Sequence, residues 1–317
     1  MSASQGKILV IRGGAIGDFV LTLPVLSALR EMFPRTRIEV LGYPHIVQIA
    51  AVGGLVDEAH SIDARPLASF FARDGELDPA QSAFFEKFDI IVSYLYDPDL
   101  FFQNNVGRCS HAQFHVGRHR PDESGDLHAT ATFLKPLERL AIFDADPIPK
   151  IEVSRCDNEP GAPGFDEAGR WLAVHPGSGS ESKNWPETKW SELLAGLLDS
   201  TDVNLFVVGG ESEGEKLARL ADGLPADRHM VFRSQPLGEL ARCLKRCVGF
   251  VGHDSGITHL AAAVGLPGVA LWGDTSFEIW GPLSESVQTL RNEAGLAGLS
   301  VGEVSAAIED LLAGKAH

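Results

Sequence analysis

The sequence lacks a long apolar run. Among its 317 residues, no uninterrupted apolar stretch approaches the roughly 20 residues that a membrane-spanning helix needs. The apolar segment near the start is broken by Arg12 and Asp18 and has no small-residue cleavage site. We therefore expect neither a transmembrane helix nor a secretory signal peptide.

Cysteine is scarce, and the spacing of the four cysteines does not suggest a metal site. Cys243 and Cys247 lie four residues apart in a helical pattern, which indicates core positions, and Cys109 and Cys156 stand alone. Because reduced thiols are usual in the cytoplasm, we expect a cytoplasmic protein without a bound metal.

Basic residues are fewer than acidic ones, 27 against 43. The net charge is −16, which argues against a nucleic-acid partner because phosphate backbones require basic surface. Residues 1–150 carry 14 basic against 19 acidic side chains, a net of −5, and residues 151–317 carry 13 against 24, a net of −11. The less acidic first half is therefore the better place for an anionic partner. Three arginines and three histidines cluster there: Arg108, His111, His115, Arg118, His119 and Arg120. A solvated loop would show the same pattern.

Short apolar runs alternate with helical patterns in both halves of the chain. This alternation predicts two α/β domains, each with a mostly parallel sheet flanked by helices. The predicted strands are 7–11, 38–42, 89–93, 171–175, 203–208, 230–232, 247–251 and 268–272, and the predicted helices are 19–32, 185–198, 213–221, 236–245 and 257–264. The Pro- and Gly-rich stretch 157–164 reads as a linker, which gives domains of 1–156 and 165–317. A capping box at Ser300 and Glu303 predicts a terminal helix.

The most informative segment is residues 252–259, which read GHDSGITH. A buried strand precedes it and an Ala-rich helix follows, so Asp254 and Ser255 stand where a helix N-cap belongs. Free N–H groups and the positive end of the helix dipole at such a turn favour a phosphate. A capped turn without any ligand has the same pattern.

A Gly-rich turn follows the first predicted strand and contains Gly13, Gly14 and Gly17. It differs from the dinucleotide fingerprint, because Arg12 stands where the first glycine is required, so we expect no nicotinamide or flavin cofactor. Asp18 opens the next helix. It could stabilise the helix dipole or act as a general base, and its position in the sequence does not separate the two.

A third loop, residues 175–186, reads HPGSGSESKNWP. Its small residues permit close approach of a ligand to the backbone, Ser178 offers a hydroxyl, and Lys183 offers a positive charge to a phosphate. A flexible loop with a solvated lysine is the alternative.

Taken in order, these segments resemble glycosyltransferase family 9, the ADP-heptose:lipopolysaccharide heptosyltransferases and their relatives. The matching segments are Arg12 with Ile16–Pro24, His175–Ser178 with Lys183, Trp185 and Pro186, Gly209, Gly210 and Glu213, Asp254–Gly256 with His259–Ala262, and Leu271–Thr275 with Trp280–Pro282. The resemblance spans nearly the whole chain. It implies a GT-B architecture, in which two Rossmann-like domains face each other across a cleft and a terminal helix packs back toward the first domain.

The resemblance also implies roles for individual residues. Asp18 would be the catalytic base of a direct, inverting transfer, and Lys183 would stabilise the leaving nucleoside diphosphate without a metal or other cofactor. The donor nucleotide-sugar would contact Ser178, Lys183, Glu213, Gln235, Asp254, Ser255, Gly256 and His259. The acceptor side would be formed by Gly13, Gly14, Gly17, Arg118 and Arg120. The acceptor would be a lipid-linked or core oligosaccharide, with peripheral contact at the inner face of the cytoplasmic membrane.

Some positions depart from the family pattern. Gly179 replaces a second hydroxyl residue, Gln235 stands where relatives have an apolar residue in the base pocket, and Gly13 and Gly14 precede Ala15 where most relatives have a bulkier residue. These departures admit another donor or another glycan. An epimerase or hydrolase, or a nucleotide-sugar-binding protein without catalysis, would share much of the pattern, and His259 could be a structural core histidine.

Overall fold

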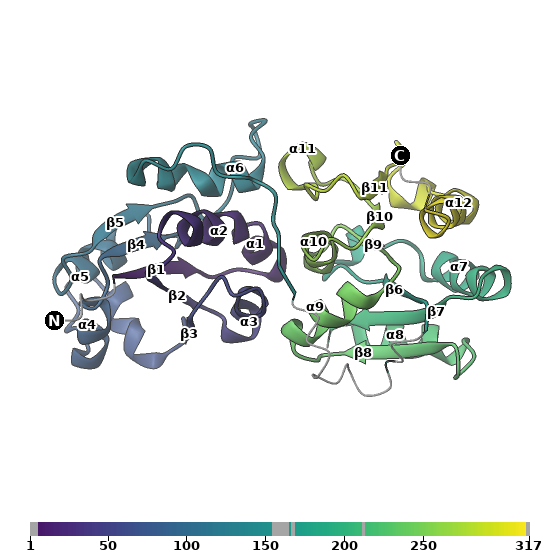
Figure 1. Ribbon diagram of the computed structural model, residues 1–317, viewed down its shortest axis with the longest axis horizontal. Coiled ribbons are helices and arrows are strands. Elements are labelled where there is room, and N and C mark those ends of the chain that lie inside the picture. Colours follow the sequence, from purple (N-terminus) through teal and green to yellow (C-terminus); the bar gives the residue numbers. More distant parts are fainter. Residues whose placement is uncertain (1–5, 154–164, 166–168, 211–212, 315–317) are drawn as a thin grey trace. The chain divides into compact units, whose positions relative to one another are not determined.

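The computed structural model describes residues 6–153, 165, 169–210 and 213–314. It divides into two compact units, Met1–Pro149 and Lys150–His317 (Figure 1). The linker predicted over residues 157–164 lies outside the described residues.

The first unit has a five-stranded sheet in the order β3-β2-β1-β4-β5, and each neighbouring pair is parallel. Its strands are β1 (Lys7–Arg12), β2 (Arg37–Gly42), β3 (Glu58–Ser61), β4 (Ile90–Ser93) and β5 (Gln113–Val116). Its helices are α1 (Ile16–Val20), α2 (Leu23–Met32), α3 (Pro44–Val52), η1 (Arg65–Phe71), α4 (Pro79–Phe85), α5 (Phe101–Gly107), α6 (Ala129–Leu134) and η2 (Lys135–Leu140).

Side-chain alternation along β1 directs residues to both faces of this sheet. Leu9 and Ile11 belong to a buried cluster with the aromatic rings of η1, α4 and α5, among them Phe85 and Phe102. Val10 and Arg12 point to the opposite face. All six residues of β1 except Lys7 are buried, which explains the continuous apolar run in the sequence.

The second unit has a six-stranded sheet in the order β11-β10-β9-β6-β7-β8, again with parallel neighbours. Its strands are β6 (Trp171–His175), β7 (Asn204–Gly209), β8 (His229–Arg233), β9 (Gly249–His253), β10 (Gly268–Leu271) and β11 (Val287–Leu290). Its helices are η3 (Glu181–Lys183), α7 (Glu187–Ser200), α8 (Gly214–Asp222), α9 (Leu237–Arg246), α10 (Gly256–Ala263), α11 (Phe277–Trp280), η5 (Leu296–Gly298) and α12 (Val301–Leu312).

The main core of the second unit lies between its sheet and helices α7, α8 and α12. Leu172 and Val174 of β6 pack there with Trp190 of α7 and Ile308 of α12. The predicted capping box starts α12, because Ser300 N donates to Glu303 Oε2 (2.8 Å) and Glu303 N donates to Ser300 Oγ (3.2 Å). The predicted terminal helix is therefore confirmed.

Both sheets reverse their direction of growth at one point. In the first unit the reversal falls between β1 and β4, and in the second between β6 and β9. Ligands of open α/β sheets bind beyond the carboxyl ends of the strands at such a switch point. The loops singled out in the sequence leave β1, β6 and β9, so they border these two points.

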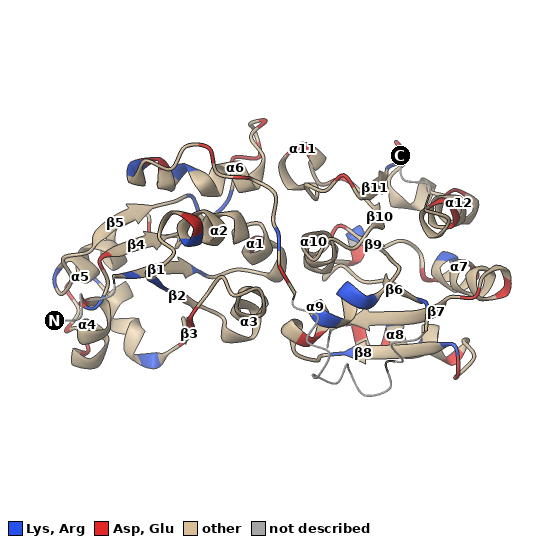
Figure 2. Ribbon diagram, viewed as in Figure 1, with Lys and Arg blue, Asp and Glu red and all other residues tan. Residues whose placement is uncertain are grey.

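No helix within the described parts of the chain is long and apolar enough to cross a membrane. Cys243 and Cys247 are buried in the second unit, as predicted for core cysteines. Acidic side chains are spread over both units, including α7 and α12, and basic ones mark α9 (Figure 2).

Candidate active site

The loops after β6 and β9 are joined by an ion pair. Lys183 Nζ lies 2.6 Å from Asp254 Oδ2, and the two residues are 71 positions apart in the sequence. The lysine side chain is 39% exposed and the aspartate side chain 9%. Ser178 lies in the same loop as Lys183, and its hydroxyl lies 2.8 Å from Asn184 Oδ1 and 2.8 Å from Ser180 O. The loop after β6 therefore carries both an ammonium and a hydroxyl, and it leaves the sheet at the switch point of the second unit.

A buried histidine, His253, holds the two loops together. Its Nε2 accepts hydrogen bonds from Trp185 N (2.9 Å) and Trp190 Nε1 (3.3 Å), and its Nδ1 lies 3.3 Å from Gly177 O. Two N–H donors at Nε2 require the neutral ring with its proton on Nδ1, which donates to Gly177. Burial lowers the pKa of His253 to about 3, only partly opposed by the Gly177 carbonyl. The ring stays neutral throughout the physiological range.

Helix α10 begins two residues after Asp254. Ser255 is the N-cap, because its Oγ accepts from Thr258 N at 3.3 Å, and Gly256 is the first helical residue. The free N–H groups of this first turn can donate hydrogen bonds to an anion. His259, one turn further, is 6% exposed, and its ring meets Trp272 edge to face at 6.4 Å.

Glu213 lies beside the loop after β6 although it follows β7. Its Oε2 accepts from Gly210 N at 2.7 Å, and a Cβ at Gly177 would overlap its carboxylate. Glycine at position 177 thus lets Glu213 reach the switch point. Lys216, one turn into α8, donates to Pro176 O at 2.8 Å, and burial lowers its pKa despite the neighbouring glutamates.

Among the residues expected on the donor side, Gln235 follows the strand that is furthest from β6 in the sheet. It is exposed and follows β8, which β7 separates from β6. A larger ligand that starts at the β6–β9 switch point would have to extend across β7 to reach it.

In the first unit the Gly-rich turn shapes the surroundings of Asp18. Asp18 Oδ2 accepts from Ala15 N at 3.0 Å, and Gly14 has a φ of +105°, with a hypothetical Cβ only 2.8 Å from that same oxygen. Because both backbone angle and space exclude a side chain at position 14, the glycine is needed for the carboxylate position. Gly13 precedes it in the turn and Gly17 lies in α1.

Arg12 fixes Asp18 from the other side. This arginine is 3% exposed. Its Nη2 lies 3.6 Å from Asp18 Oδ1 and 3.2 Å from Asp18 O, while its Nη1 donates to His119 O at 2.8 Å. The guanidinium also lies 4.4 Å from the centroid of the Phe133 ring. Burial lowers the pKa of Arg12, and the Asp18 carboxylate offsets part of that effect; the guanidinium nevertheless keeps its charge in proteins.

The arginines and histidines expected on the acceptor side have different environments. Arg118 and Arg120 are exposed, and Arg118 lies 3.6 Å from Asp122. Arg108 instead donates to Gly75 O at 2.9 Å. His115 is 7% exposed, and its two buried ring nitrogens have no hydrogen-bond partner among the described residues. The cluster of three arginines and three histidines that the sequence suggested therefore does not form one exposed basic surface.

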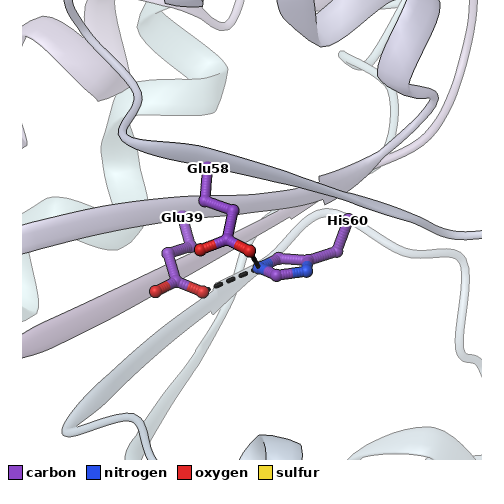
Figure 3. Close-up of side chains that lie close together, drawn as sticks. All are labelled: Glu39, Glu58 and His60. Atoms are coloured by element: carbon purple, nitrogen blue, oxygen red, sulfur yellow. Dashed lines mark hydrogen bonds and ion pairs between the residues drawn. The ribbon is translucent and has the colours of Figure 1, made fainter.

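Three potential metal ligands, Glu39, Glu58 and His60, come together on β2 and β3 (Figure 3). His60 Nε2 lies 2.7 Å from Glu39 Oε2, but Glu39 Oε1 accepts from Arg37 Nε at 2.8 Å and Lys7 Nζ at 3.3 Å. Burial raises the pKa of Glu39, and the three hydrogen bonds together outweigh it and lower that pKa. Arg37 pairs with both carboxylates and Lys7 pairs with Glu39. We therefore interpret the arrangement as an ion-pair network and not as a metal site. The cluster lies on the face of the sheet opposite Arg12.

Comparisons with known proteins assign the family. Residues 119–300 match the model of glycosyltransferase family 9 (heptosyltransferase). The chain belongs to glycosyltransferase family 9.

Full-length relatives agree with this family assignment. Lipopolysaccharide heptosyltransferase 3 of Escherichia coli K12 is 22% identical over 336 residues, which covers 93% of this chain and 95% of the relative. A putative glycosyltransferase of Haemophilus influenzae is 22% identical over 290 residues, with 84% and 82% coverage. The chain is therefore a glycosyltransferase enzyme of the lipopolysaccharide heptosyltransferase type.

Solved structures agree on the fold. E. coli ADP-heptose lps heptosyltransferase II has a TM-score of 0.78 at 18% identity and covers 98% of this chain and 99% of its own. E. coli heptosyltransferase WaaC with ADP has a TM-score of 0.76 at 20% identity, with 96% and 99% coverage. The predicted GT-B fold, with two parallel α/β units, is confirmed.

Two residues of the candidate site received no role in the sequence analysis. Arg12 was noted as a replaced glycine of another fingerprint and as part of the family motif, although a charge ending a strand buried on both faces is itself a signal. His253 offered no such signal, because its three partners lie 63 to 76 residues away in the sequence.

Proposed function

We propose that this enzyme transfers heptose from ADP-heptose to an acceptor of the lipopolysaccharide-core type, with inversion and without a metal. The observation that carries the proposal is the Lys183–Asp254 ion pair, which joins the loop after β6 to the residues that begin α10 at the β6–β9 switch point. The relatives named lipopolysaccharide heptosyltransferases, and the solved structure named with ADP, favour this donor and this acceptor.

In the proposed reaction, Asp18 removes the proton from an acceptor hydroxyl. The hydroxyl oxygen attacks the anomeric carbon of the donor sugar from the side opposite the leaving group. The bond from that carbon to the phosphate oxygen breaks, and the nucleoside diphosphate leaves with the electron pair. A single displacement of this kind inverts the anomeric configuration, and it needs a base held in position, a role that a carboxylate can fill. The contacts from Ala15 N and Arg12 support that role for Asp18.

Charge on the leaving diphosphate would be stabilised by Lys183, Ser178 and the N–H groups around Ser255 and Gly256. Asp254 already neutralises Lys183 in the free protein, so the diphosphate would share the ammonium with it. As an anion, Asp254 itself suits sugar hydroxyls better than phosphate. Glu213 would accept ribose hydroxyls, while His259 and Gln235 would lie near the donor sugar and the base.

A transfer assay tests the proposal. The purified protein is incubated in EDTA with ADP-heptose and delipidated lipopolysaccharide core oligosaccharide, and the product is analysed by mass spectrometry and NMR. We expect one heptose to be added, with an anomeric configuration opposite to that of the donor. Free heptose or an epimer released without acceptor would instead show a hydrolase or an epimerase.

Location follows from the same proposal. Nucleotide-sugar donors are cytoplasmic metabolites, so we place the protein in the cytoplasm, with peripheral contact at the inner face of the membrane when the acceptor is lipid-linked. Fractionation of cells that produce the natural acceptor would test this, and recovery of the protein outside the cytoplasm would contradict it.

A further inference from the structure

An exposed aromatic ring lies in the loop that follows β4. This loop borders the switch point of the first sheet, because β4 is the neighbour of β1 at which the strand order reverses. Tyr96 lies in that loop and is 70% exposed. Its ring packs against the imidazole of His119, with centroids 4.7 Å apart and an interplanar angle of 57°.

Arg12 connects this aromatic pair to Asp18. One nitrogen of its guanidinium donates to the backbone carbonyl of His119 at 2.8 Å, and the other lies 3.6 Å from the Asp18 carboxylate. A buried, doubly anchored arginine is a rigid connector, so the position of the His119 segment relative to Asp18 is set by the fold.

The His119 ring is suited to uncharged hydroxyl groups. Burial lowers its pKa first, the nearby Arg120 and Arg12 lower it further, and Asp18 opposes them only in part. A neutral imidazole offers one donor and one acceptor to a hydroxyl. Arg120 is exposed beside it and can meet an anionic group on the same ligand.

We propose that Tyr96 and His119 form a saccharide-binding platform, on which a sugar ring of the acceptor stacks so that its hydroxyl faces Asp18. A pyranose ring presents polarised C–H groups on one face and hydroxyls at its edges. The negative face of an aromatic ring attracts such C–H groups, and the polar tip of tyrosine remains in water. This inference rests on the proposed function, since it names the binding site of the acceptor in that reaction.

The test measures binding of delipidated lipopolysaccharide core oligosaccharide to the free protein by NMR titration, without donor or turnover. Three variants are compared: Tyr96→Ala, Tyr96→Phe, which keeps the ring, and Phe143→Ala. Phe143 is a matched control in the same unit, because it is also 70% exposed and is not part of the platform.

We expect Tyr96→Ala to weaken oligosaccharide binding about tenfold, the loss of about 1.4 kcal/mol. Tyr96→Phe should restore most of the affinity, and Phe143→Ala should behave as the wild type. Equal binding by the wild type and Tyr96→Ala, an equal loss in Phe143→Ala, or no binding to the wild type would overturn the platform. ADP titration of the same samples tests the donor site separately, so oligosaccharide binding without ADP binding would refute the proposed function and keep the platform.

Discussion

The two units hold their key carboxylates in different ways. In the first unit Asp18 is fixed by groups from the same strand-turn-helix segment, namely Ala15 N and Arg12, only three and six residues away. In the second unit Asp254 pairs with Lys183 across 71 residues, and His253, the residue before Asp254, bonds Gly177 O of the loop after β6. The direct contacts of Asp18 are therefore local, although Arg12 is itself anchored by His119 O, whereas the contacts of Asp254 depend on which strands are neighbours in the sheet. Substitutions should therefore separate a chemical effect in the first unit from binding and stability effects in the second.

The largest effect is expected at Asp18. Asp18→Asn keeps the shape of the side chain and removes the basic oxygen, so kcat should fall about 1000-fold, within the range for loss of a general base. The affinity for ADP, measured by calorimetry, should stay within twofold of the wild type. A large loss of ADP affinity would mean that Asp18 belongs to donor binding and not to proton transfer.

A smaller effect is expected at Lys183. Lys183→Ala removes a charge-assisted contact with the diphosphate and should raise the Kd for ADP about 10- to 100-fold. Lys87→Ala, an exposed lysine of the first unit, serves as the control for net charge. If both variants bind ADP like the wild type, the loop after β6 is not a phosphate site.

His253 gives the second unit a pH-dependent stability. Its folded pKa of about 3 lies below the ordinary value of 6.5, so the unfolded state takes up a proton that the folded state refuses as the pH falls below 6.5. The contribution of His253 to the free energy of unfolding is fully present above pH 6.5. It decreases as the pH falls toward 3, by up to about 1.4 kcal/mol per pH unit. Between pH 7 and pH 5 the wild type should lose about 2 kcal/mol more than His253→Asn.

Urea unfolding followed by tryptophan fluorescence measures this difference. All five tryptophans lie in residues 150–317, so the signal reports the second unit. His253→Asn also leaves buried N–H donors less well satisfied, which should lower its stability at pH 7 by about 1–3 kcal/mol. Identical pH slopes in the two proteins would contradict the neutral, buried role of His253.

Removal of divalent metal should have the smallest effect. The transfer rate in EDTA should equal the rate with added Mg²⁺ if Lys183 and the start of α10 stabilise the leaving diphosphate, as we propose. Activity lost in EDTA and recovered with Mg²⁺ would overturn the metal-free mechanism.

Sequence analysis predicted the two parallel α/β units and every inner strand, because strands buried on both faces are continuous apolar runs. It did not predict β3, β5 or β11. All three are sheet edges, and β3 reads EAHS with little burial. Edge strands of four residues face water, so neither length nor apolar pattern distinguishes them from loops.

The candidate site shows the same limit. Glycines and a carboxylate next to a predicted helix start indicated Asp18, Ser255 and Gly256 as candidate site residues, because such a pattern is visible within a few neighbouring positions. The Lys183–Asp254 pair, the His253 contacts and the platform of Tyr96 and His119 depend on which strands are neighbours in the sheet. No spacing in the sequence encodes that order.

The most direct test of the central claim is a calorimetric titration of the wild-type protein with ADP, UDP, GDP and CDP in EDTA. The account predicts that ADP binds with a clear preference over the other three, and that Lys183→Ala weakens it. If no nucleoside diphosphate binds, the loops joined by Lys183 and Asp254 are not a donor site, and selective binding of another nucleotide would refute ADP-heptose as the donor.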